Sequence, residues 1–457
     1  MSERRHLGRF ERLLTLCTTV QPGEGRCIAL LFLQAFSLMV AWYLIRPVRE
    51  ALILTEGDAE LRSYAVGAQA LLLIGLVPLY GLMIRNVAAS RVFQRVILFF
   101  AFNLLLFFLL GLAGHKFGVV FFVWASIFAV MAVAQFWAFA SDLLNVSTGK
   151  RLFGVIAVGI SAGGWVGSRI ASAAFEPFGP YGLMLASAAV LCGSVSLSRL
   201  AQHSVPPAAR SPAAAMGESG EVRAGHWLSG FALIGRSRYL VGIAALVTLL
   251  NWISSTGDYV FSNWLSEIAG QQAPEARAGF IGRFMGGFCS TITLVGLLIQ
   301  LLLVSRIIQL AGIARALAVT PIAFVAGYLL VGFVPVFALL QSVLVVQKSL
   351  DYSLLNTTRS ALLLPASREE KYQAKTAIDT VFFRLGDLLS TLSVFIGSRL
   401  LADNRLQYVW LILVLSAAMT LVAWLIGREY ARRYDASRAP SLSGLPQHAG
   451  PAAVLVQ

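Results

Sequence analysis

A cluster of charges follows the first apolar stretch of the chain, in the order Arg46, Pro47, Val48, Arg49 and Glu50. A charge at the centre of a bilayer costs about 2.5–3.5 kcal/mol on insertion scales, so such residues normally face a polar cavity or a partner. Proline lacks a backbone donor and favours an irregular backbone at this point. The two arginines could bind phosphate or carboxylate through bidentate hydrogen bonds. Alternatively, both reach the outer membrane surface, with Arg49 and Glu50 as a surface pair.

A second group of charges lies in the apolar stretch at about 334–356, where Lys348 and Asp351 are three residues apart. Residues at this spacing share one side of a helix and can form an ion pair. We expect this pair to line a cavity, with an ion bridge that changes between conformations. The alternative is a buried structural pair that fixes helix packing.

A third group lies in the next apolar stretch. Arg384 and Asp387 are again three residues apart, and Asp379 precedes Arg384 by five residues. One cation and two acids within three turns of helix cannot all face lipid, because each charge is costly there. The sequence therefore predicts an internal ion network, which either contacts cargo or serves packing alone.

Isolated polar residues in other apolar stretches are weaker candidates. Gln135 and Asp142 lie near the end of the stretch at 118–141, beside aromatic residues that are more often packing residues or interface anchors than stacking platforms. Asp258 lies near the outer end of the stretch at 239–262. It is either a cargo-binding or gating acid or an interfacial residue.

Glycines recur at a spacing of four in two stretches: Gly159, Gly163 and Gly167 in one, Gly282 and Gly286 in the other. Glycine at this spacing lets helices approach closely in membranes. The pattern predicts close helix packing, at an interface that moves.

No group of residues predicts catalysis, a metal site or a bound cofactor. The cysteines are scattered and form no CxxC or Cys/His cluster: Cys17, Cys27, Cys192 and Cys289. The segment ending in Gly149 and Lys150 resembles the end of a P-loop, but the position that needs the first glycine holds Leu144. We therefore expect no ATPase and no enzyme.

Composition shows which elements must hold these charges. Of 457 residues, 58% are hydrophobic and 13% charged, with a mean hydropathy of +0.76. Soluble domains are about 45–50% apolar and about 25% charged, so a soluble enzyme is nearly excluded. The net charge of +14 could suggest nucleic acid, but in a membrane chain it marks cytoplasmic loops. We expect the lipid bilayer and a small-molecule anionic cargo as partners, and no nucleic acid.

Twelve apolar segments have the length of a membrane-spanning helix. They lie at about 27–47, 63–84, 94–113, 118–141, 152–174, 180–200, 239–262, 284–304, 314–332, 334–356, 376–400 and 406–427. This pattern predicts an all-α membrane protein of twelve transmembrane helices in two six-helix bundles of major-facilitator type. Lys and Arg concentrate in the tails and after the even-numbered helices, which predicts cytoplasmic termini.

The expected divisions follow from these segments. They are a cytoplasmic N-terminal segment at 1–26, a first bundle at 27–200, a cytoplasmic linker at 201–237, a second bundle at 238–428 and a cytoplasmic, disordered tail at 429–457. We expect a multi-pass protein of a bacterial inner membrane.

Three motifs resemble those of the nucleotide (ATP/ADP) translocase family and its relatives in free-living bacteria. The string at 46–50 is similar to the family pattern R-x-x-[K/R]-[D/E] at the end of helix 1. Residues 136–163 are similar to the pattern FWxFxxDLxxxxxGKRLFGxIAxGxSAG of the free-living relatives. Residues 351–387 are similar to the family's YSL and K-x-[K/A]-K-x-x-I-D patterns.

The resemblance implies a nucleotide exchanger of the major-facilitator fold. By the same resemblance, the positions that matter for binding are Arg49, Arg359, Lys371, Lys375 and Asp379.

This sequence departs from the family pattern at several positions. Gln135 stands where the exchangers have glutamate, Ser254 falls near their helix 7 glutamate, and Thr357 and Ser360 replace the proline and the acid of the YSL motif.

We expect exchange of nucleotides or a related phosphorylated anion by alternating access. The alternatives are an ion-coupled transporter of another organic anion or drug, and a membrane scaffold that transports nothing.

Overall fold

The computed structural model describes residues 20–83, 88–206, 209, 227–364, 373–400 and 404–442, and it is built almost entirely of helices there. Lipid offers no hydrogen bonds to the backbone, so apolar stretches of this length must satisfy their N–H and C=O groups within a helix. In the described residues, nine helices are long and apolar enough to cross a membrane. The expected all-α membrane architecture is confirmed.

The first half of the chain contains five long helices. They are α2 (Gly25–Glu56), α3 (Ala59–Met83), α4 (Ala89–Leu112), α5 (Gly118–Leu143) and α6 (Val146–Ser204). Helix α6 crosses twice because it turns back at Gly179, where φ is +65° and prolines stand at 177 and 180. A positive φ is strained for a residue with a side chain, and proline cannot continue the helical ladder. The first half therefore makes six crossings.

The second half also makes six crossings. Its elements are α9 (Arg238–Gly270), α10 (Pro274–Leu302), α11 (Val304–Phe333), α12 (Phe337–Leu350), η2 (Asp351–Leu355), α13 (Asn356–Leu362), α14 (Lys375–Ala377), η4 (Ile378–Phe382), α15 (Phe383–Leu400) and α16 (Arg405–Leu442). The segments η2 and η4 are π-helical and interrupt the tenth and eleventh crossings. Such π segments often lie at functional sites.

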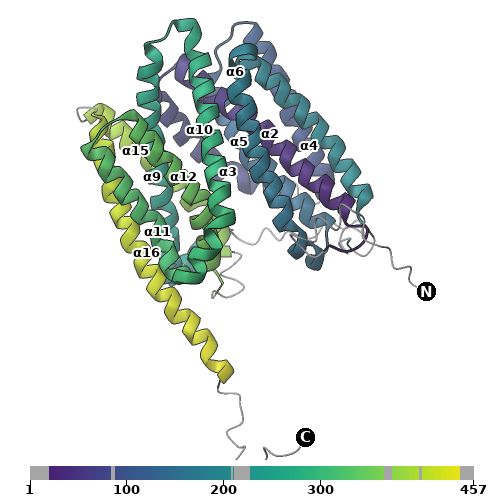
Figure 1. Cartoon of the computed structure of the whole chain (residues 1–457), viewed down its shortest axis with the longest axis vertical. Coiled ribbons are helices and arrows are strands. Elements are labelled where there is room, and N and C mark those ends of the chain that lie inside the picture. The colour runs from purple at the N-terminus through teal and green to yellow at the C-terminus, as the bar shows by residue number, and fades with distance from the viewer. Residues whose placement is uncertain are drawn as a thin grey trace, which may run out of the picture.

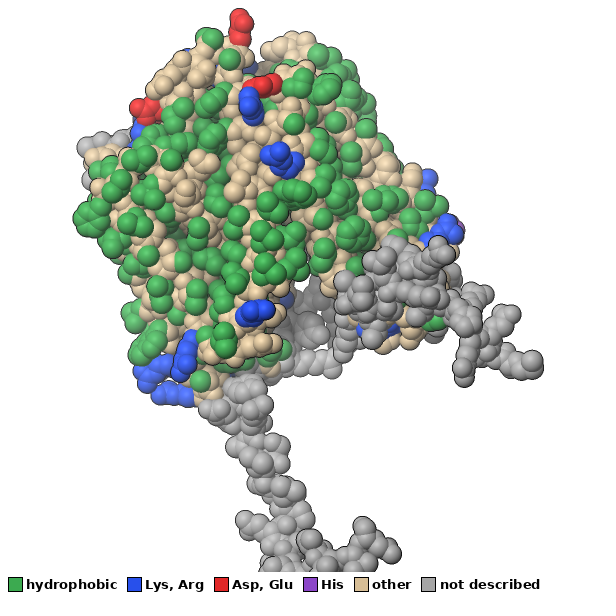
Figure 2. Space-filling model, in the orientation of Figure 1, with side chains coloured by type: hydrophobic (Ala, Val, Ile, Leu, Met, Phe, Trp, Pro, Cys, Tyr) green, Lys and Arg blue, Asp and Glu red, His purple; other side chains and the backbone are tan. Residues whose placement is uncertain are grey.

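The two halves stand side by side, with the start of α2 and the end of α16 at the same face (Figure 1). We call this the termini face and the opposite one the far face. Helices α6 and α10 meet toward the far face, and the ribbons of the two halves diverge toward the termini face (Figure 1). Apolar side chains cover the middle of the visible surface, and charged side chains gather toward its two ends (Figure 2).

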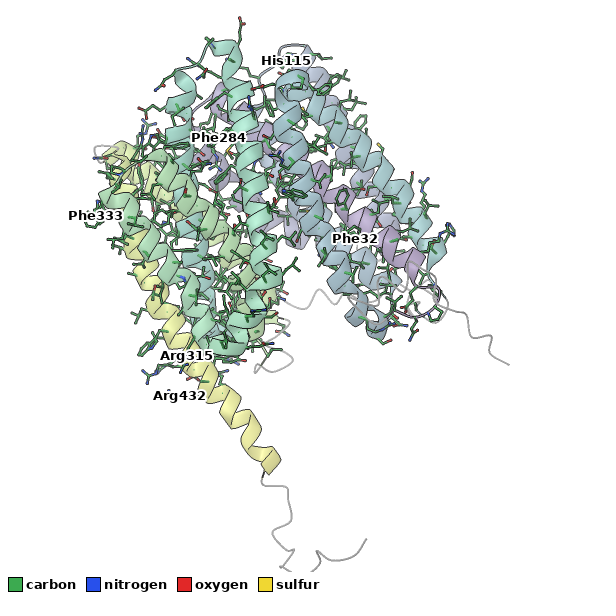
Figure 3. The ribbon with its side chains drawn as sticks, in the orientation of Figure 1. Phe32, His115, Phe284, Arg315, Phe333 and Arg432 are labelled. Carbon is green, nitrogen blue, oxygen red and sulfur yellow. The ribbon has the colours of Figure 1, made fainter. Side chains whose placement is uncertain are left out.

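Large apolar side chains point outward from the middle of the molecule, as expected for a protein surrounded by lipid. Phe333, for example, is 72% exposed and projects from the lateral surface at the end of α11 (Figure 3). The chain is a multi-pass membrane protein.

Two helices extend into stretches that the sequence assigned to a linker and to a tail. The stretch expected to be a linker contains the helix α8 (Trp227–Arg236), and α16 continues to Leu442, well into the stretch expected to be a disordered tail. Helix α8 is mainly apolar and too short to span a membrane, whereas α16 continues past its apolar part into polar residues.

The glycine stripes pack closely, as predicted. A Cβ atom on Gly163 would lie 2.3 Å from the carbonyl oxygen of Phe36, within the first half. A Cβ atom on Gly286 would lie 2.7 Å from the backbone nitrogen of Ser172, in the other half. Of these two contacts, only the second therefore lies between the halves.

Candidate functional site

A cleft lies between the two halves on the termini side of the molecule. It has a volume of about 610 Å³, within the range of small-molecule sites, and is lined by α2 and α6 from the first half and by α10, η2 and α13 from the second. Its walls run from Tyr43 and Tyr352, midway along their crossings, to Gln300 and Thr357 near the termini face. Segments far apart in sequence therefore enclose one space.

Arg46 lies one turn beyond Tyr43, at the end of the cleft toward the far face. Its guanidinium lies 5.5 Å from the centre of the Tyr43 ring, and its Nη1 atom donates a 3.4 Å hydrogen bond to the Tyr43 hydroxyl. Tyr352 and Cys289 of the other half lie within electrostatic range of it. No acid in the described residues pairs with Arg46, so its charge remains available to a ligand.

Arg49 lies one turn further along α2 and belongs to a buried ion cluster. Its Nη2 atom is 2.5 Å from Oε1 of Glu50, and its guanidinium lies 4.4 Å from the centre of the Phe122 ring. Arg62 of α3 donates from Nε to Oε2 of Glu50 at 2.6 Å. Glu50 is only 2% exposed, so the alternative of a surface pair with Arg49 was wrong. Helix α3 covers this carboxylate, which no local pattern in the sequence reveals.

Lys348 pairs with an acid from another helix. Its Nζ atom is 2.8 Å from Oδ1 of Asp258, which α9 brings across the second half. The expected pair with Asp351 was wrong: no ion pair joins them in the described residues. Asp351 begins the π-helical segment η2, whose wider turn breaks the simple spacing rule, and Asp258 offers a closer carboxylate.

These residues form one group, which we call the central charge cluster. Its members are Arg46, Arg49, Glu50, Arg62, Asp258 and Lys348. The cluster members from the two halves of the protein lie in electrostatic range of each other, since Arg62 is near Asp258 and Lys348 is near Arg46. Four cations stand against two acids, so the cluster carries two surplus positive charges, a balance suited to an anion.

The predicted ion pair of the eleventh crossing is confirmed. Nη1 of Arg384 lies 3.2 Å from Oδ2 of Asp387. Asp387 also accepts a 2.6 Å hydrogen bond from Ser255 of α9, and its side chain is 7% exposed. This pair is neutral as a whole and joins α9 to α15.

A further pair lies nearer the termini face. Nη2 of Arg359 is 3.8 Å from Oδ1 of Asp379, a long contact between two partly exposed side chains. Lys375, four residues before Asp379, is exposed. Arg359 and Asp379, two of the positions that the family resemblance singles out, therefore meet at the termini end of the tenth and eleventh crossings, and Lys375 lies about one turn before Asp379.

Of the weaker candidates, Asp258 belongs to the central charge cluster, and no ion pair in the described residues joins the others to it. Gln135 is 5% exposed within α5, and Asp142 is half-buried in the last turn of that helix. The side chain of Lys150 and all of Lys371 lie outside the described residues.

Sequence reasoning missed three members of the site. Arg62 was counted with a loop because the apolar stretch begins after it, whereas α3 begins at Ala59 and buries it. Tyr43 and Tyr352 line the cleft from different halves. The signal available for Arg62 was the apolar stretch that begins directly after it, whereas nothing in the sequence pairs the two tyrosines.

Polar contacts join the two halves near the far face. Thr391 of α15 donates a 2.9 Å hydrogen bond to the carbonyl of Ser63 in α3, and Ser172 of α6 donates a 3.0 Å bond to the carbonyl of Arg283 in α10. Arg283 also forms a 2.8 Å ion pair with Glu176. The halves are thus held together at the far face, while the cleft lies toward the termini face.

Solved structures share this arrangement. A mutant of the nucleoside transporter NupG matches with a TM-score of 0.63 at 13% identity, over 88% of this chain and 99% of that one. The chain has the major-facilitator fold. A bacterial homologue of the human lysosomal transporter Spinster, inward-facing and unoccupied, matches this major-facilitator chain with a TM-score of 0.59 at 12% identity, over 91% of this chain and 99% of that one.

The human organic anion transporter MFSD10 also matches, with a TM-score of 0.56 at 16% identity, over 89% of this chain and 100% of that one. No family model matches this sequence, and no curated protein matches it. The two-bundle architecture of major-facilitator type expected from the apolar segments is confirmed.

Proposed function

We propose that this major-facilitator protein is a secondary transporter that exchanges small phosphorylated anions, with nucleotides as the first candidates. The carrying observation is the surplus of two positive charges in the central charge cluster, at the closed end of the cleft between the halves. Cations buried at this depth are costly unless an anion or a partner compensates them. The printed functions of two similar structures, nucleoside and organic anion transport, agree with such a cargo.

Arg46 is the proposed first contact of the cargo. It is the cation of the cluster without an acidic partner in the described residues, and it stands beside two tyrosines that line the cleft. A guanidinium offers several donors in a planar fork, which matches phosphate or carboxylate oxygens. Arg49 and Arg62 share Glu50 and supply the remaining positive potential.

A second basic group lies at the proposed entrance of the cleft. Arg359, Lys375 and Asp379 lie at the termini end of the tenth and eleventh crossings. The long Arg359–Asp379 contact of 3.8 Å can open at little cost as an anion passes, because partly exposed ion pairs contribute little stability. Lys375 adds a positive charge there that draws anions toward the cleft.

Transport would proceed by alternating access, in which the two halves rock about a site near the membrane midplane. In the structure described here the far face is closed by contacts such as Thr391–Ser63 and Arg283–Glu176. We place the termini face in the cytoplasm of a bacterial cell and the protein in its inner membrane, because Lys and Arg concentrate at that face. The state described would then be the one open to the cytoplasm.

A second coupling mode has one specific observation in its favour. Asp351 is partly buried in the tenth crossing and has no ion-pair partner in the described residues. Acids in such positions serve as proton carriers in many transporters. A proton-coupled organic anion transporter is therefore the alternative to exchange.

Counterflow in liposomes separates these functions. The purified protein is reconstituted, vesicles are loaded with ADP, and uptake of labelled ATP, ADP and inorganic phosphate is measured with and without the internal nucleotide. Exchange predicts uptake that rises at least tenfold with internal nucleotide and is insensitive to a pH gradient.

Proton coupling predicts the reverse: uptake that follows the pH gradient, needs no internal cargo, and is lost in Asp351→Asn. No uptake of any anion under either gradient, by a protein that keeps its fold, would leave a membrane scaffold as the function.

A further inference from the structure

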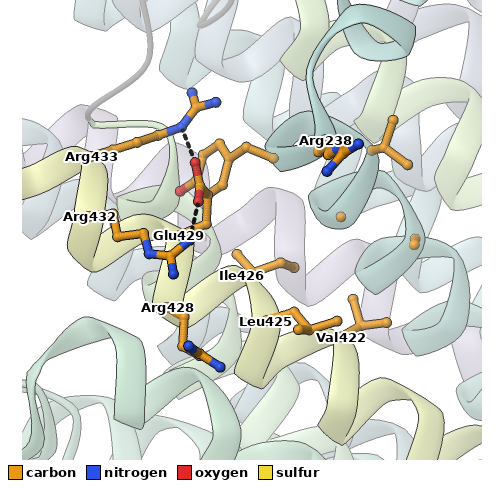
Figure 4. Close-up of a pocket in the computed structure, with 12 residues that line it drawn as sticks. Arg238, Val422, Leu425, Ile426, Arg428, Glu429, Arg432 and Arg433 are labelled. Atoms are coloured by element: carbon orange, nitrogen blue, oxygen red, sulfur yellow. Dashed lines mark hydrogen bonds and ion pairs between the residues drawn. The ribbon is translucent and has the colours of Figure 1, made fainter.

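A groove on the outer surface of the second half lies away from the cleft between the halves. It has a volume of about 730 Å³ and is formed by the termini ends of α9 and α16 (Figure 4). The groove faces outward between these two helices, as the exposed side chains of Val241 and Leu425 show, so the proposed cargo does not reach it.

The walls of the groove change from apolar to basic along both helices. On α9, Ala245 and Val241 lead to Arg238, which is the first residue of the helix. On α16, Val422 and Leu425 lead to arginines, of which Arg428 lies next along the groove. The spacings of three and four residues on α9, and of three and three on α16, keep each series on one side of its helix. The groove-lining side chains of the two helices therefore change from apolar to positively charged at the same level.

The basic end has a large surplus of positive charge. Four arginines, at 238, 428, 432 and 433, stand around a single acid, Glu429. Glu429 is held by Arg433 at 3.3 Å and more loosely by Arg432 at 3.8 Å. Arg238 and Arg428 have no acidic partner in the described residues. The groove thus carries three positive charges that the protein itself does not compensate.

Several of these arginines are held in place at the edge of the groove. The Arg428 guanidinium lies 4.7 Å from the centre of the Trp424 ring, and that of Arg433 lies 4.6 Å from the Tyr239 ring. Tryptophan and arginine at the end of a crossing are typical of the boundary between acyl chains and headgroups. Arg432 is 71% exposed and free to meet a ligand (Figure 3).

We propose that this groove binds an anionic phospholipid of the leaflet at the termini face. The headgroup phosphate would lie among Arg238, Arg428 and Arg432, and one acyl chain would lie along Val241 and Leu425, which are 46% and 51% exposed. The charge favours an anion and the apolar half favours a chain, which together exclude a small soluble phosphate as the natural occupant. Basic pockets between transmembrane helices bind lipid headgroups in this manner.

The test compares phosphatidylglycerol with phosphatidylcholine of the same acyl chains, bound to the delipidated full-length protein in detergent and counted by native mass spectrometry. Three arginine contacts at roughly fivefold each predict a preference of about 100-fold for phosphatidylglycerol. The variant Arg238→Gln/Arg428→Gln/Arg432→Gln should lose that preference and keep its affinity for phosphatidylcholine. Leu425→Ser should weaken both lipids by a similar factor.

Arg306→Gln is the matched control, because Arg306 is an exposed arginine near the start of α11 that does not line the groove. It should leave the preference unchanged. Arg432→Gln alone serves if the triple variant does not fold, and it should reduce the preference about fivefold.

Equal binding of the two lipids by the unaltered protein would overturn the proposal. So would a triple variant that retains the preference, or full competition by glycerol 3-phosphate at the concentration of the lipid. Nucleotide uptake is not part of this measurement, so failure of the proposed transport function leaves the lipid result interpretable.

Discussion

In the first half of the molecule one carboxylate, Glu50, serves two guanidiniums, whereas in the second half each buried cation has an acid of its own, Asp258 for Lys348 and Asp387 for Arg384. Both halves make six crossings, yet among these buried charge groups only the one in the first half carries surplus positive charge. The difference indicates that the first half attracts the anion. The second half supplies ion pairs of balanced charge and the π-helical segments η2 and η4.

The largest effect should come from removing the shared carboxylate. Glu50→Gln leaves Arg49 and Arg62 buried without an acid, and breaking a buried ion pair typically costs about 3–5 kcal/mol. We expect little folded protein, measured as monodisperse yield and thermal unfolding in detergent. Glu60→Gln is the control, since Glu60 is a partly exposed acid paired with Arg399 at the far face.

The double variant Glu50→Gln/Arg62→Gln sharpens this result. It returns the net charge of this group to its original +1 and should recover part of the lost stability, since only Arg49 then remains buried without an acid. If Glu50→Gln folds as well as the unaltered protein, the two guanidiniums do not depend on this acid, and the contrast between the halves fails.

Removing Arg46, the arginine of the central charge cluster without an acidic partner in the described residues, should affect anion binding rather than folding. Hydrogen bonds to charged groups contribute about 1.5–3 kcal/mol, so Arg46→Gln should weaken anion binding by roughly 10–100-fold. The measurement is uptake and ligand-induced thermal stabilisation with ATP, ADP and phosphate. Arg169→Gln, a change at an exposed arginine of α6, should alter neither. An Arg46→Gln protein that transports normally would contradict the role given to this residue.

Loss of one partner from the Lys348–Asp258 pair should cost less stability than loss of the acid that Arg49 and Arg62 share. Lys348→Met leaves Asp258, whose side chain is 28% exposed and keeps some contact with water. We expect a loss of about 1–2 kcal/mol in unfolding free energy, the lower part of the range for an unpaired buried polar group.

The companion variant Lys348→Met/Asp258→Leu should regain that stability, since removing both partners of a pair can be nearly neutral. Thermal unfolding of the single and double variants measures the coupling. A double variant no more stable than the single one would show that the pair is not an independent unit.

The smallest effect concerns the far face. Arg283 and Glu176 are 63% and 56% exposed, so Arg283→Gln should have little effect on stability and shift the conformational equilibrium only slightly toward opening at that face. Gly286→Leu, which places a side chain against the backbone of Ser172, should shift it much more. Distances between spin labels across the far face measure both shifts. Equal distances in all three proteins would mean that these contacts do not hold the closed face.

Sequence alone determined the crossings and the inventory of buried charges. Apolar stretches of membrane-spanning length leave helix as the only way to satisfy the backbone, and the cost of a charge in lipid marks Arg46, Arg49, Lys348 and Arg384 as interior residues. The local pair Arg384–Asp387 was also predictable, because an intact α-helix fixes the relation between residues three apart.

Only the tertiary structure decided which charges meet across helices. Lys348 pairs with Asp258, ninety residues away in the chain, and not with its neighbour Asp351. The reason is that a π-helical segment alters the local spacing and α9 brings a closer acid. Glu50 is buried and pairs with two guanidiniums because α3 lies over it and adds Arg62 to Arg49. Electrostatic energy depends on distances of a few ångströms between helices, and helix packing, not the order of residues, sets those distances.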